Sequence, residues 1–274
     1  MLFMFMIELF PSPTVALTLF GFSVHWYGLM YFAAFLLAFF LLPKLQQYRS
    51  LTLTQDDWAT ILSWAIVGVL VGGRLGFVLF YEPSYFLHHP LEIAAVWNGG
   101  MSSHGGFIGV VLALVYAGRR RGIALLALAD IIVVPAAIGL ALGRIGNFIN
   151  GELYGTVTNL SWAVAAEGLE GLRHPAQMYA VLKDLFLAWV CLRHLLAPGS
   201  LRGRTFALFL ALYGALRFVV EYFREQPYGF IDLKIVSLSV GQLLTIPIII
   251  VGVWLWWKLG NVRRADHAQN PDVL

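Results

Sequence analysis

The stretch GRIGNFINGELYG, residues 143–155, decides how the rest of the chain is interpreted. It follows residues 131–142, an apolar run broken only by one proline and one glycine, so polar chemistry begins where a membrane helix is expected to stop. The side chains of Arg144, Asn147 and Glu152 supply hydrogen-bond donors and acceptors suited to an anionic head group. Four glycines let the backbone approach another group closely. The stretch therefore predicts a binding site and not a linker.

Composition places the chain among membrane proteins. Hydrophobic residues make up 59% of its 274 residues, charged residues make up 12%, and the mean hydropathy is +0.77, whereas soluble domains carry about a quarter charged residues. We expect an all-α polytopic membrane protein that forms one domain over residues 1–274. The net charge of +3 and the pI near 9.0 come from basic residues in short loops between apolar runs, so they indicate topology and not a nucleic-acid partner.

Cysteine and histidine content restricts the chemistry. The single cysteine, Cys191, lies in an apolar run and excludes an intrachain disulfide and a cysteine-based metal cluster. A reacting thiol would therefore arrive on a substrate. The histidines form no His-x-x-x-His or Glu-x-x-His pattern, so we expect neither a metal site nor a cofactor. No basic stretch with a cleavage site precedes the first apolar run, and we expect no removable signal peptide.

Seven apolar segments are candidates for membrane spans, each of which takes roughly 20 helical residues. They are residues 20–42, 58–81, 104–118, 124–142, 177–197, 205–223 and 236–257. The third is short unless its glycine-rich start is included. Seven transmembrane helices place the two ends of the chain on opposite sides of the membrane.

The orientation follows from the Lys and Arg residues in the loops, because cytoplasmic loops carry the excess. Loops on one side hold eleven and loops on the other side hold four. The eleven are Lys44, Arg49, Arg119, Arg120, Arg121, Arg193, Arg202, Arg204, Lys258, Arg263 and Arg264, and the four are Arg144, Arg173, Arg224 and Lys234. We expect a periplasmic N-terminus and a cytoplasmic C-terminus.

On this topology the polar motifs converge on the periplasmic face. They are residues 25–27, 98–106, 143–155 and 173–175. Residues 152–175 form the longest outer loop, and we expect a small periplasmic cap there, with a short strand at residues 161–165.

Arg217 is the most informative charge inside a predicted span. An arginine at the depth of a helix centre costs about 2.5 to 3.5 kcal/mol on insertion scales, so it needs a partner or a function. Tyr213, Arg217 and Glu221 follow at i, i+4 and i+8 and form one stripe on a helix. The Arg217–Glu221 pair alone fits charge neutralisation as well as function. Arg144 falls in the same half of the membrane, and two guanidinium groups can clamp a phosphate through bidentate hydrogen bonds.

Two further polar residues lie at outer ends of predicted spans. A lone histidine such as His104 is more often structural than catalytic, but histidine takes a proton near neutral pH. The adjacent Gly105-Gly106 pair would let a bulky lipid head group approach. Tyr27 fits either a site or the interfacial aromatic belt that its neighbour Trp26 indicates.

For the other charged residues inside the predicted spans, Arg74 and Lys183, we expect a pairing partner. Arg74 follows Gly72-Gly73 about 10 Å below the outer end of its span by the helical rise, and we expect it to pair with a carboxylate or a lipid phosphate. Lys183 stands next to Asp184 and is expected to form a neutralised pair.

The sequence resembles the prolipoprotein diacylglyceryl transferases, a family of bacterial inner-membrane enzymes. Residues 143–152 look like the family signature, and five more blocks resemble family blocks in the same order. These blocks are His25–Gly28, Gly72–Gly76, His104–Gly106, Arg173–Pro175 and Tyr213–Glu221. The resemblance runs from the first span to the last.

The resemblance implies a reaction and its partners. A diacylglyceryl group would pass from phosphatidylglycerol to the lipobox cysteine thiol in the signal peptide of a prolipoprotein, forming a thioether and releasing glycerol phosphate at the periplasmic side of the inner membrane. The implied catalytic residues are His104, Arg144, Tyr213 and Arg217. The implied substrate-binding residues are Tyr27, Asn147, Glu152, Gly155 and Glu221. We add Gly99 and Arg74 as further substrate-binding candidates.

Two positions depart from the family pattern. The family often has a bulky residue where Ser103 precedes the histidine, and often a glutamate where Ala180 follows Tyr179. Ala180 removes one possible carboxylate from any mechanism that needs an acid at that position.

Two other classes of function compete with the transferase. A transporter or flippase for an anionic lipid or small anion would also use buried arginines, but transporters commonly show internal repeats and a midplane site. The sequence has no repeat, and its polar groups cluster in one leaflet. A non-enzymatic scaffold leaves that cluster unexplained.

Overall fold

The computed structural model describes residues 7–12, 14–20, 22–96, 99–166, 168–226, 229–232 and 237–269. The chain divides into two compact units, unit 1 with Met1–Ala38 and Ala129–Leu274, and unit 2 with Phe39–Leu128. Helices predominate. The long ones are α1 (Trp26–Leu45), α2 (Gln55–Phe80), α4 (Ser103–Arg120), α5 (Leu125–Ile149), α6 (Ala176–Leu196), α7 (Arg204–Glu221) and α8 (Val240–Gln269).

Every segment predicted as a span overlaps one of these helices. Within the described residues, four helical stretches are long and apolar enough to cross a membrane, namely Trp26–Arg49, Gln55–Phe80, Leu125–Ile149 and Val240–Asn261. Charged residues lie inside α6 and α7, as they also do inside α2 and α5. In α6 they are Lys183, Asp184 and Arg193, and in α7 they are Arg204, Arg217 and Glu221.

A small sheet precedes α1, and the sequence analysis did not predict it. Strands β1 (Ile7–Ser12), β2 (Val15–Leu19) and β3 (Phe22–His25) pair antiparallel in that order. The chain turns at Phe20, whose φ of 51° is left-handed. The prediction that the first helix begins at residue 20 is therefore wrong, because valine, threonine and aromatic residues here pair as strands.

The fourth predicted span also ends later than expected. We predicted its end at residue 142, but α5 continues to Ile149. Gly146 is buried, and a Cβ there would lie 3.3 Å from the Tyr27 ring, so this glycine serves helix packing and does not end the helix. Arg144 and Asn147 consequently lie on the last turns of α5 and not in a loop.

Short elements join the helices. They are η1 (Gln46–Arg49), α3 (Pro83–His88), η2 (Pro90–Ala94), β4 (Val164–Ala165), β5 (Leu172–Arg173), β6 (Phe230–Asp232) and β7 (Ser237–Ser239). β4 pairs with β5, and β6 pairs with β7. The strand predicted at residues 161–165 is confirmed only at Val164–Ala165.

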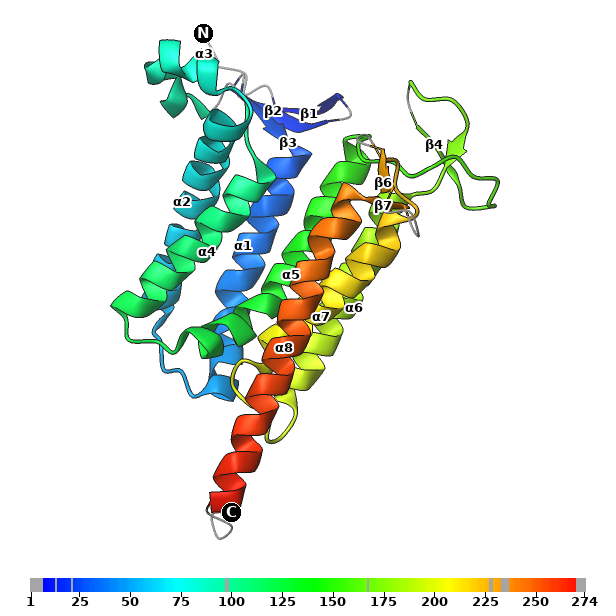
Figure 1. The fold of residues 1–274 in the computed structure, drawn as a ribbon. Helices are drawn as coiled ribbons and strands as arrows, with labels where there is room; N and C mark the ends of the chain where they lie inside the picture. Colours follow the sequence, from blue (N-terminus) through cyan, green and yellow to red (C-terminus); the bar gives the residue numbers. More distant parts are fainter. Residues whose placement is uncertain are drawn as a thin grey trace. The chain divides into compact units, whose positions relative to one another are not determined.

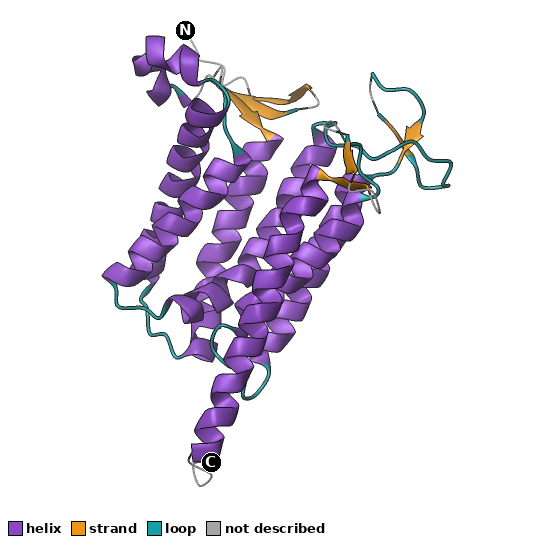
Figure 2. Ribbon diagram, viewed as in Figure 1, coloured by secondary structure: helices purple, strands orange, loops and turns teal. Residues whose placement is uncertain are grey.

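In unit 1, α5 to α8 alternate in direction along the chain (Figure 1). The C-terminal ends of α5 and α7 therefore lie at the same end of the unit as the N-terminal ends of α6 and α8. Figure 2 shows the strand pairs β4–β5 and β6–β7 at this end, in the connections that precede α6 and α8. Residues distant in sequence meet here.

A buried carboxylate fixes the opposite end of α7. Asp130 on α5 is fully buried, and its two carboxylate oxygens each accept a hydrogen bond of 2.7 Å, one from Gly203 N and one from Phe206 N. These amides belong to the first turn of α7, where backbone N–H groups lack helical partners and favour a negative charge. Asp130 thus ties α7 to α5.

In unit 2, α2 and α4 pack through glycines. A Cβ at Gly68 would lie 2.5 Å from the Gly109 carbonyl oxygen, and a Cβ at Gly76 would lie 2.8 Å from Gly105 Cα. Gly72 lies between them and would collide with the Gly105 backbone if it carried a side chain. Small residues spaced by four allow membrane helices to approach this closely. Gly105, which we had predicted to admit a lipid head group, is therefore buried against α2.

Replacement of Gly109 tests this contact. Gly109→Ala places a Cβ into the backbone of α2 at Gly68, which cannot move away as a flexible side chain could. We expect a loss of about 1 to 3 kcal/mol in stability, typical of overpacking, measured as a lower Tm in detergent. Gly106→Ala is the matched control on the same helix, because its Cβ would meet Val69 O at 3.6 Å, an ordinary contact. Equal Tm values for the two variants would contradict the packing argument.

Candidate active site

The end of unit 1 where four helices meet carries a chain of polar contacts that begins on α5. Arg144 Nη1 donates to Asn147 Oδ1 at 3.2 Å, one turn further along the helix. Asn147 is 3% exposed, and its Nδ2 donates to the Tyr27 hydroxyl at 2.9 Å. Tyr27 belongs to the first turn of α1. The amide of Asn147 therefore joins Arg144 to Tyr27 and orients both.

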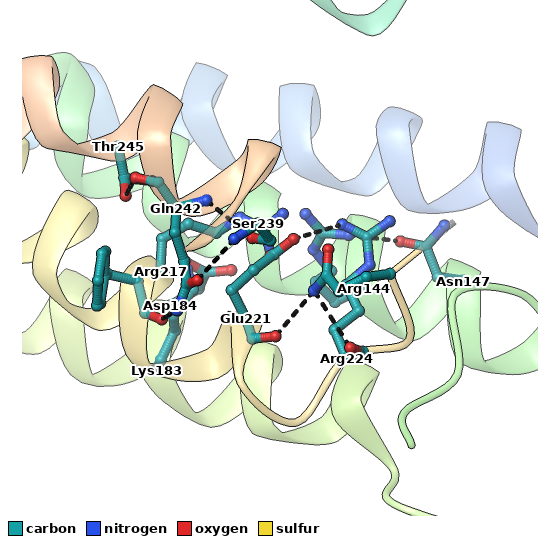
Figure 3. Close-up of polar contacts among 12 residues, drawn as sticks. Arg144, Asn147, Lys183, Asp184, Arg217, Glu221, Arg224, Ser239, Gln242 and Thr245 are labelled. Atoms are coloured by element: carbon teal, nitrogen blue, oxygen red, sulfur yellow. Dashed lines mark hydrogen bonds and ion pairs between the residues drawn. The ribbon is translucent and has the colours of Figure 1, made fainter. Parts of the chain in front are cut away.

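A second cluster lies at the end of α7. Arg217 Nη1 lies 2.6 Å from Glu221 Oε2, and Arg224 Nη1 lies 3.8 Å from Glu221 Oε1. Glu221 is 4% exposed and lies between the two arginines (Figure 3). The predicted Arg217–Glu221 pair is confirmed, and Arg224 adds a second cation to the same carboxylate.

Glu221 also contacts the first turn of α8. A Cβ at Gly241 would collide with Glu221 Oε1 and lie 2.7 Å from its carboxyl carbon. The turn is closed by Ser239 and Gln242, since Ser239 N donates to Gln242 Oε1 at 2.9 Å and Gln242 N donates to Ser239 Oγ at 3.1 Å. A helix N-terminus favours an anion. The negative charge of Glu221 is thus stabilised by two arginines and by the start of α8.

A cavity opens between these clusters. It is small and partly open to solvent, and it is lined by Arg144, Leu153, Ala176, Gln177, Ala180, Arg217, Val220 and Arg224. Three of these side chains are guanidinium groups from α5, α7 and the segment after α7. Burial, followed by the positive charge of Arg217, lowers the pKa of Arg224 from its ordinary value, but arginine remains protonated in proteins. The cavity wall is therefore strongly positive.

Arg224 is a site residue that the sequence analysis missed, since it counted Arg224 only as a loop charge. The signal was the spacing from Arg217 to Glu221 to Arg224, which continues the stripe by a further three residues. The position of Arg224 depends on Gly155, with which it forms an isolated antiparallel bridge. Gly155 is buried, and a Cβ there would lie 2.5 Å from Phe223 O and from His174 O. Only glycine allows the three backbones to come this close.

Other predicted residues of unit 1 lie at the edge of this arrangement. Glu152 is exposed, and its carboxylate accepts a hydrogen bond of 3.1 Å from Asn150 Nδ2. Tyr213 is half-buried on α7, with Lys183 Nζ 4.7 Å from its ring centroid. Lys183 forms the predicted pair with Asp184. Cys191 is fully buried on α6, as expected for a packing residue.

Unit 2 contains three predicted site residues. Arg74 is 5% exposed and its guanidinium donates to four backbone carbonyls, those of Ile93 (3.0 Å), Gly99 (2.6 Å), Gly100 (3.2 Å) and Glu92 (2.6 Å). We had expected a carboxylate or a lipid phosphate as the partner of Arg74; in the described residues its partners are instead backbone carbonyls of η2 and of the segment that follows it. The prediction of a carboxylate partner is wrong, and a lipid phosphate stays untested. Arg74 holds that segment in place.

Gly99 and His104 flank the start of α4. Gly99 has a left-handed backbone with φ of 81° and open space where a Cβ would stand. His104 is exposed in the first turn of α4, two residues after Ser102, whose hydroxyl caps the helix by accepting from Gly105 N. Asn98, part of the predicted outer segment, lies outside the described residues.

The arrangement in unit 1 is built to bind an anion. Two guanidinium groups can each form paired hydrogen bonds to a phosphate, and a third adds charge at short range. Glu221 offsets only part of the positive charge. The lining of the cavity therefore presents several hydrogen-bond donors and an excess of positive charge, the chemistry that suits an anion.

Comparison with known proteins agrees with this chemistry. The family model described as prolipoprotein diacylglyceryl transferase matches residues 14–258. The chain belongs to the prolipoprotein diacylglyceryl transferase family. Curated relatives named phosphatidylglycerol–prolipoprotein diacylglyceryl transferase include that of Geobacter sulfurreducens, 47% identical over 84% of this chain and 88% of the relative. The relative from Methylobacillus flagellatus is 41% identical over 88% of this chain and 94% of its own length. The relative from Bordetella avium is 40% identical over 90% of this chain and 95% of its own length.

The matched region of this family member includes the cavity and the two positions that depart from the family pattern, Ser103 and Ala180. Ala180 is 4% exposed and lines the cavity. Ala180 therefore contributes no charge to the cavity wall. Glu221 is the carboxylate that contacts the arginines here.

Replacement of Gly241 tests how Glu221 is held. Gly241→Ala forces a methyl group against the carboxylate, which its ion pair with Arg217 restrains. We expect a loss of about 1 to 3 kcal/mol in stability, read as a lower Tm in detergent. Gly260→Ala on the same helix is the control, since its Cβ would lie no closer than 3.6 Å to Arg204.

A double-mutant cycle tests whether the loss of stability in Gly241→Ala comes from contact of the new methyl group with Glu221. Adding Glu221→Ala to Gly241→Ala removes the group that the methyl meets, so the double variant should lose less stability than the sum of the single losses. Strict additivity would show that the two positions do not interact.

Proposed function

We propose that the chain transfers the diacylglyceryl group of phosphatidylglycerol to the lipobox cysteine thiol of a prolipoprotein, the reaction named for its relatives. The observation that carries this proposal is the cavity lined by Arg144, Arg217 and Arg224 in a chain that matches the family over residues 14–258. The names of the relatives do not favour a transporter.

The reaction exchanges one bond to carbon for another. The thiolate sulfur attacks the glyceryl carbon that carries the phosphoester oxygen, the sulfur–carbon bond forms, and the carbon–oxygen bond breaks. Its electron pair leaves on the oxygen of glycerol phosphate, and the thiol proton passes to a base. A free cysteine has a pKa of about 8.5, so a base or a positive field assists thiolate formation.

The three arginines supply the electrostatic part of catalysis. They hold the phosphodiester of the lipid in the ground state and gain strength as the leaving oxygen becomes an anion. Glu221 restrains Arg217 and Arg224 without neutralising the cavity. Asn147 and Tyr27 orient Arg144, and Gly155 positions Arg224. These three residues therefore contribute to substrate binding by holding the arginines in place.

Residues outside the cavity complete the proposal. His104 takes the thiol proton, a role assigned from the family resemblance and from the chemistry of histidine. Tyr213 lies one helical turn from Arg217 and contributes a hydroxyl to the reacting groups. Gly99 contacts substrate through its backbone, and Arg74 contributes by holding Gly99. Glu152 contributes through its carbonyl, which binds a cavity residue.

We also propose a topology in which all seven long helices span the bacterial inner membrane as one domain. The excess of basic residues in one set of loops supports a cytoplasmic C-terminus and a periplasmic N-terminus. Residues 152–175 then form a small periplasmic cap beside the cavity, and the site faces the periplasm. Lys183 pairs with Asp184 and Arg217 pairs with Glu221, which favours the burial of these charges in a membrane.

The assay that tests the proposed function uses phosphatidylglycerol radiolabelled in its acyl chains and a peptide that carries a lipobox cysteine. We expect label to pass to the peptide with release of glycerol phosphate. The same peptide with serine in place of cysteine is the control. Movement of labelled lipid across a vesicle membrane without peptide labelling would support a flippase instead.

Arginine-to-lysine variants test the phosphate clamp. A lysine keeps the charge but is a point charge, which cannot reproduce the planar two-bond fork of a guanidinium. We expect Arg144→Lys and Arg217→Lys each to lose about 10² to 10³ in kcat, the usual effect of removing one such donor. Arg193→Lys, an exposed change near the other end of α6, is the control. Full activity of both cavity variants would exclude a bidentate clamp.

The role of His104 is tested by pH dependence. His104→Gln keeps hydrogen-bonding capacity but takes no proton at neutral pH, so its defect should shrink as the external pH approaches the thiol pKa of about 8.5. The arginine variants should show no such recovery. A His104→Gln defect that is equal at every pH would show that His104 positions a substrate, with the thiolate generated by the positive field.

Reporter fusions test the topology. A reporter that is active only in the periplasm should be silent after Leu274 and active when inserted near Leu160, in the proposed cap. The reverse pattern, or activity at both positions, would overturn the seven-span arrangement.

A further inference from the structure

Gln177 is a buried amide in the wall of the arginine cavity. It lies in the first turn of α6, is 2% exposed, and lines the cavity together with Arg144, Arg217 and Arg224. The sequence analysis assigned it no role. A polar side chain that is this deeply buried is expected to have its hydrogen-bonding atoms paired.

Only one side of the amide is paired. Gln177 Nε2 donates to the Glu152 carbonyl oxygen at 2.7 Å, which fixes the orientation of the amide because only its nitrogen can donate. Its Oε1 has no hydrogen-bond partner among the described residues. The Oε1 atom of Gln177 is therefore an oriented hydrogen-bond acceptor without a donor among the described residues.

The three arginines in the rest of the cavity wall are hydrogen-bond donors, whereas Gln177 Oε1 is an acceptor. Guanidinium groups are donors only, and they satisfy the oxygens of a phosphate. A head group that also carries a donor needs an acceptor beside the phosphate, and among the residues that line the cavity Gln177 supplies a neutral one. The positive wall disfavours a cationic donor such as an ammonium group, so a neutral hydroxyl is the better match.

We propose that Gln177 is a specificity-determining residue whose Oε1 accepts a hydrogen bond from a hydroxyl of the phospholipid head group. This inference rests on the proposed function and adds to it the chemical feature by which the lipid is selected: an anionic phosphodiester beside a neutral alcohol. A site built to bind a hydroxyl rejects an analogue that lacks it, because the buried acceptor then stays unpaired.

The experiment compares two lipids with the same acyl chains, phosphatidylglycerol and phosphatidyl-1-propanol, whose head group has no hydroxyl. The bond that breaks is the same in both lipids, so a difference in kcat/KM reports recognition of the head group. We expect the wild type to prefer phosphatidylglycerol by roughly tenfold or more. Gln177→Met, which keeps the length of the side chain without its amide, should bring the ratio close to one.

The ratio separates recognition from structure. Loss of the bond to Glu152 would lower activity toward both lipids equally and leave their ratio unchanged. Gln226→Met is the matched control, since Gln226 Nε2 also donates to backbone carbonyls, those of Glu221 at 2.9 Å and Arg224 at 3.2 Å, but Gln226 does not line the cavity. This variant should keep the wild-type ratio.

Each outcome decides the inference. Transfer from phosphatidylglycerol without discrimination by the wild type, or a ratio unchanged in Gln177→Met, overturns it while the proposed function stands. No transfer from phosphatidylglycerol by the wild type overturns the proposed function itself. If Gln177→Met does not fold, Gln177→Asn withdraws the acceptor by one methylene, and the wild-type ratio alone still tests the preference.

Discussion

One buried carboxylate surrounded by cations organises the site of this protein. Glu221 contacts Arg217, Arg224 and the first turn of α8, and so links the end of one helix to the start of the next. Charges in an apolar environment are costly unless they are paired, and three arginines with one carboxylate leave the cavity positive. That excess is compatible with a folded membrane protein if an anionic lipid supplies the missing negative charge.

Glycine is the means by which the charged groups are brought close. Gly241 lets α8 approach the carboxylate of Glu221, and Gly155 lets three backbone segments meet so that Arg224 reaches the cavity. In unit 2, the glycines of α2 and α4 serve helix packing. The same residue type therefore has two uses, and only the neighbours of each glycine show which use applies.

The proposed function and the proposed role of Gln177 divide recognition into two parts. In this proposal the arginines bind what all anionic phospholipids share, the phosphodiester, and stabilise the leaving group. Gln177 would then contact what distinguishes one head group from another. Ala180 lines the same wall without a charge, so the proposed selection assigns the role of acceptor to an amide and not to a further carboxylate.

Much of the fold followed from the sequence, because apolar runs and the distribution of basic residues are local properties that hydrocarbon and water impose on each segment. The seven long helices were predicted on this basis, and the Arg217–Glu221 pair followed from its i, i+4 spacing. The strands before α1 and the extension of α5 to Ile149 were not, since strand pairing and the tolerance of a helix for glycine depend on neighbours.

The sequence by itself determined that this is a helical membrane protein with arginines near one end of its spans, and its motifs identified the family. Only the tertiary structure decided which residues share the cavity. Arg224 joins Arg144 across 80 positions of sequence through a bridge to Gly155, Arg74 binds backbone carbonyls and no carboxylate, and Gln177 keeps an unpaired oxygen. Periodicity reports which face of a helix is apolar, whereas contacts between helices depend on how closely their backbones pack, and that is a property of the folded chain.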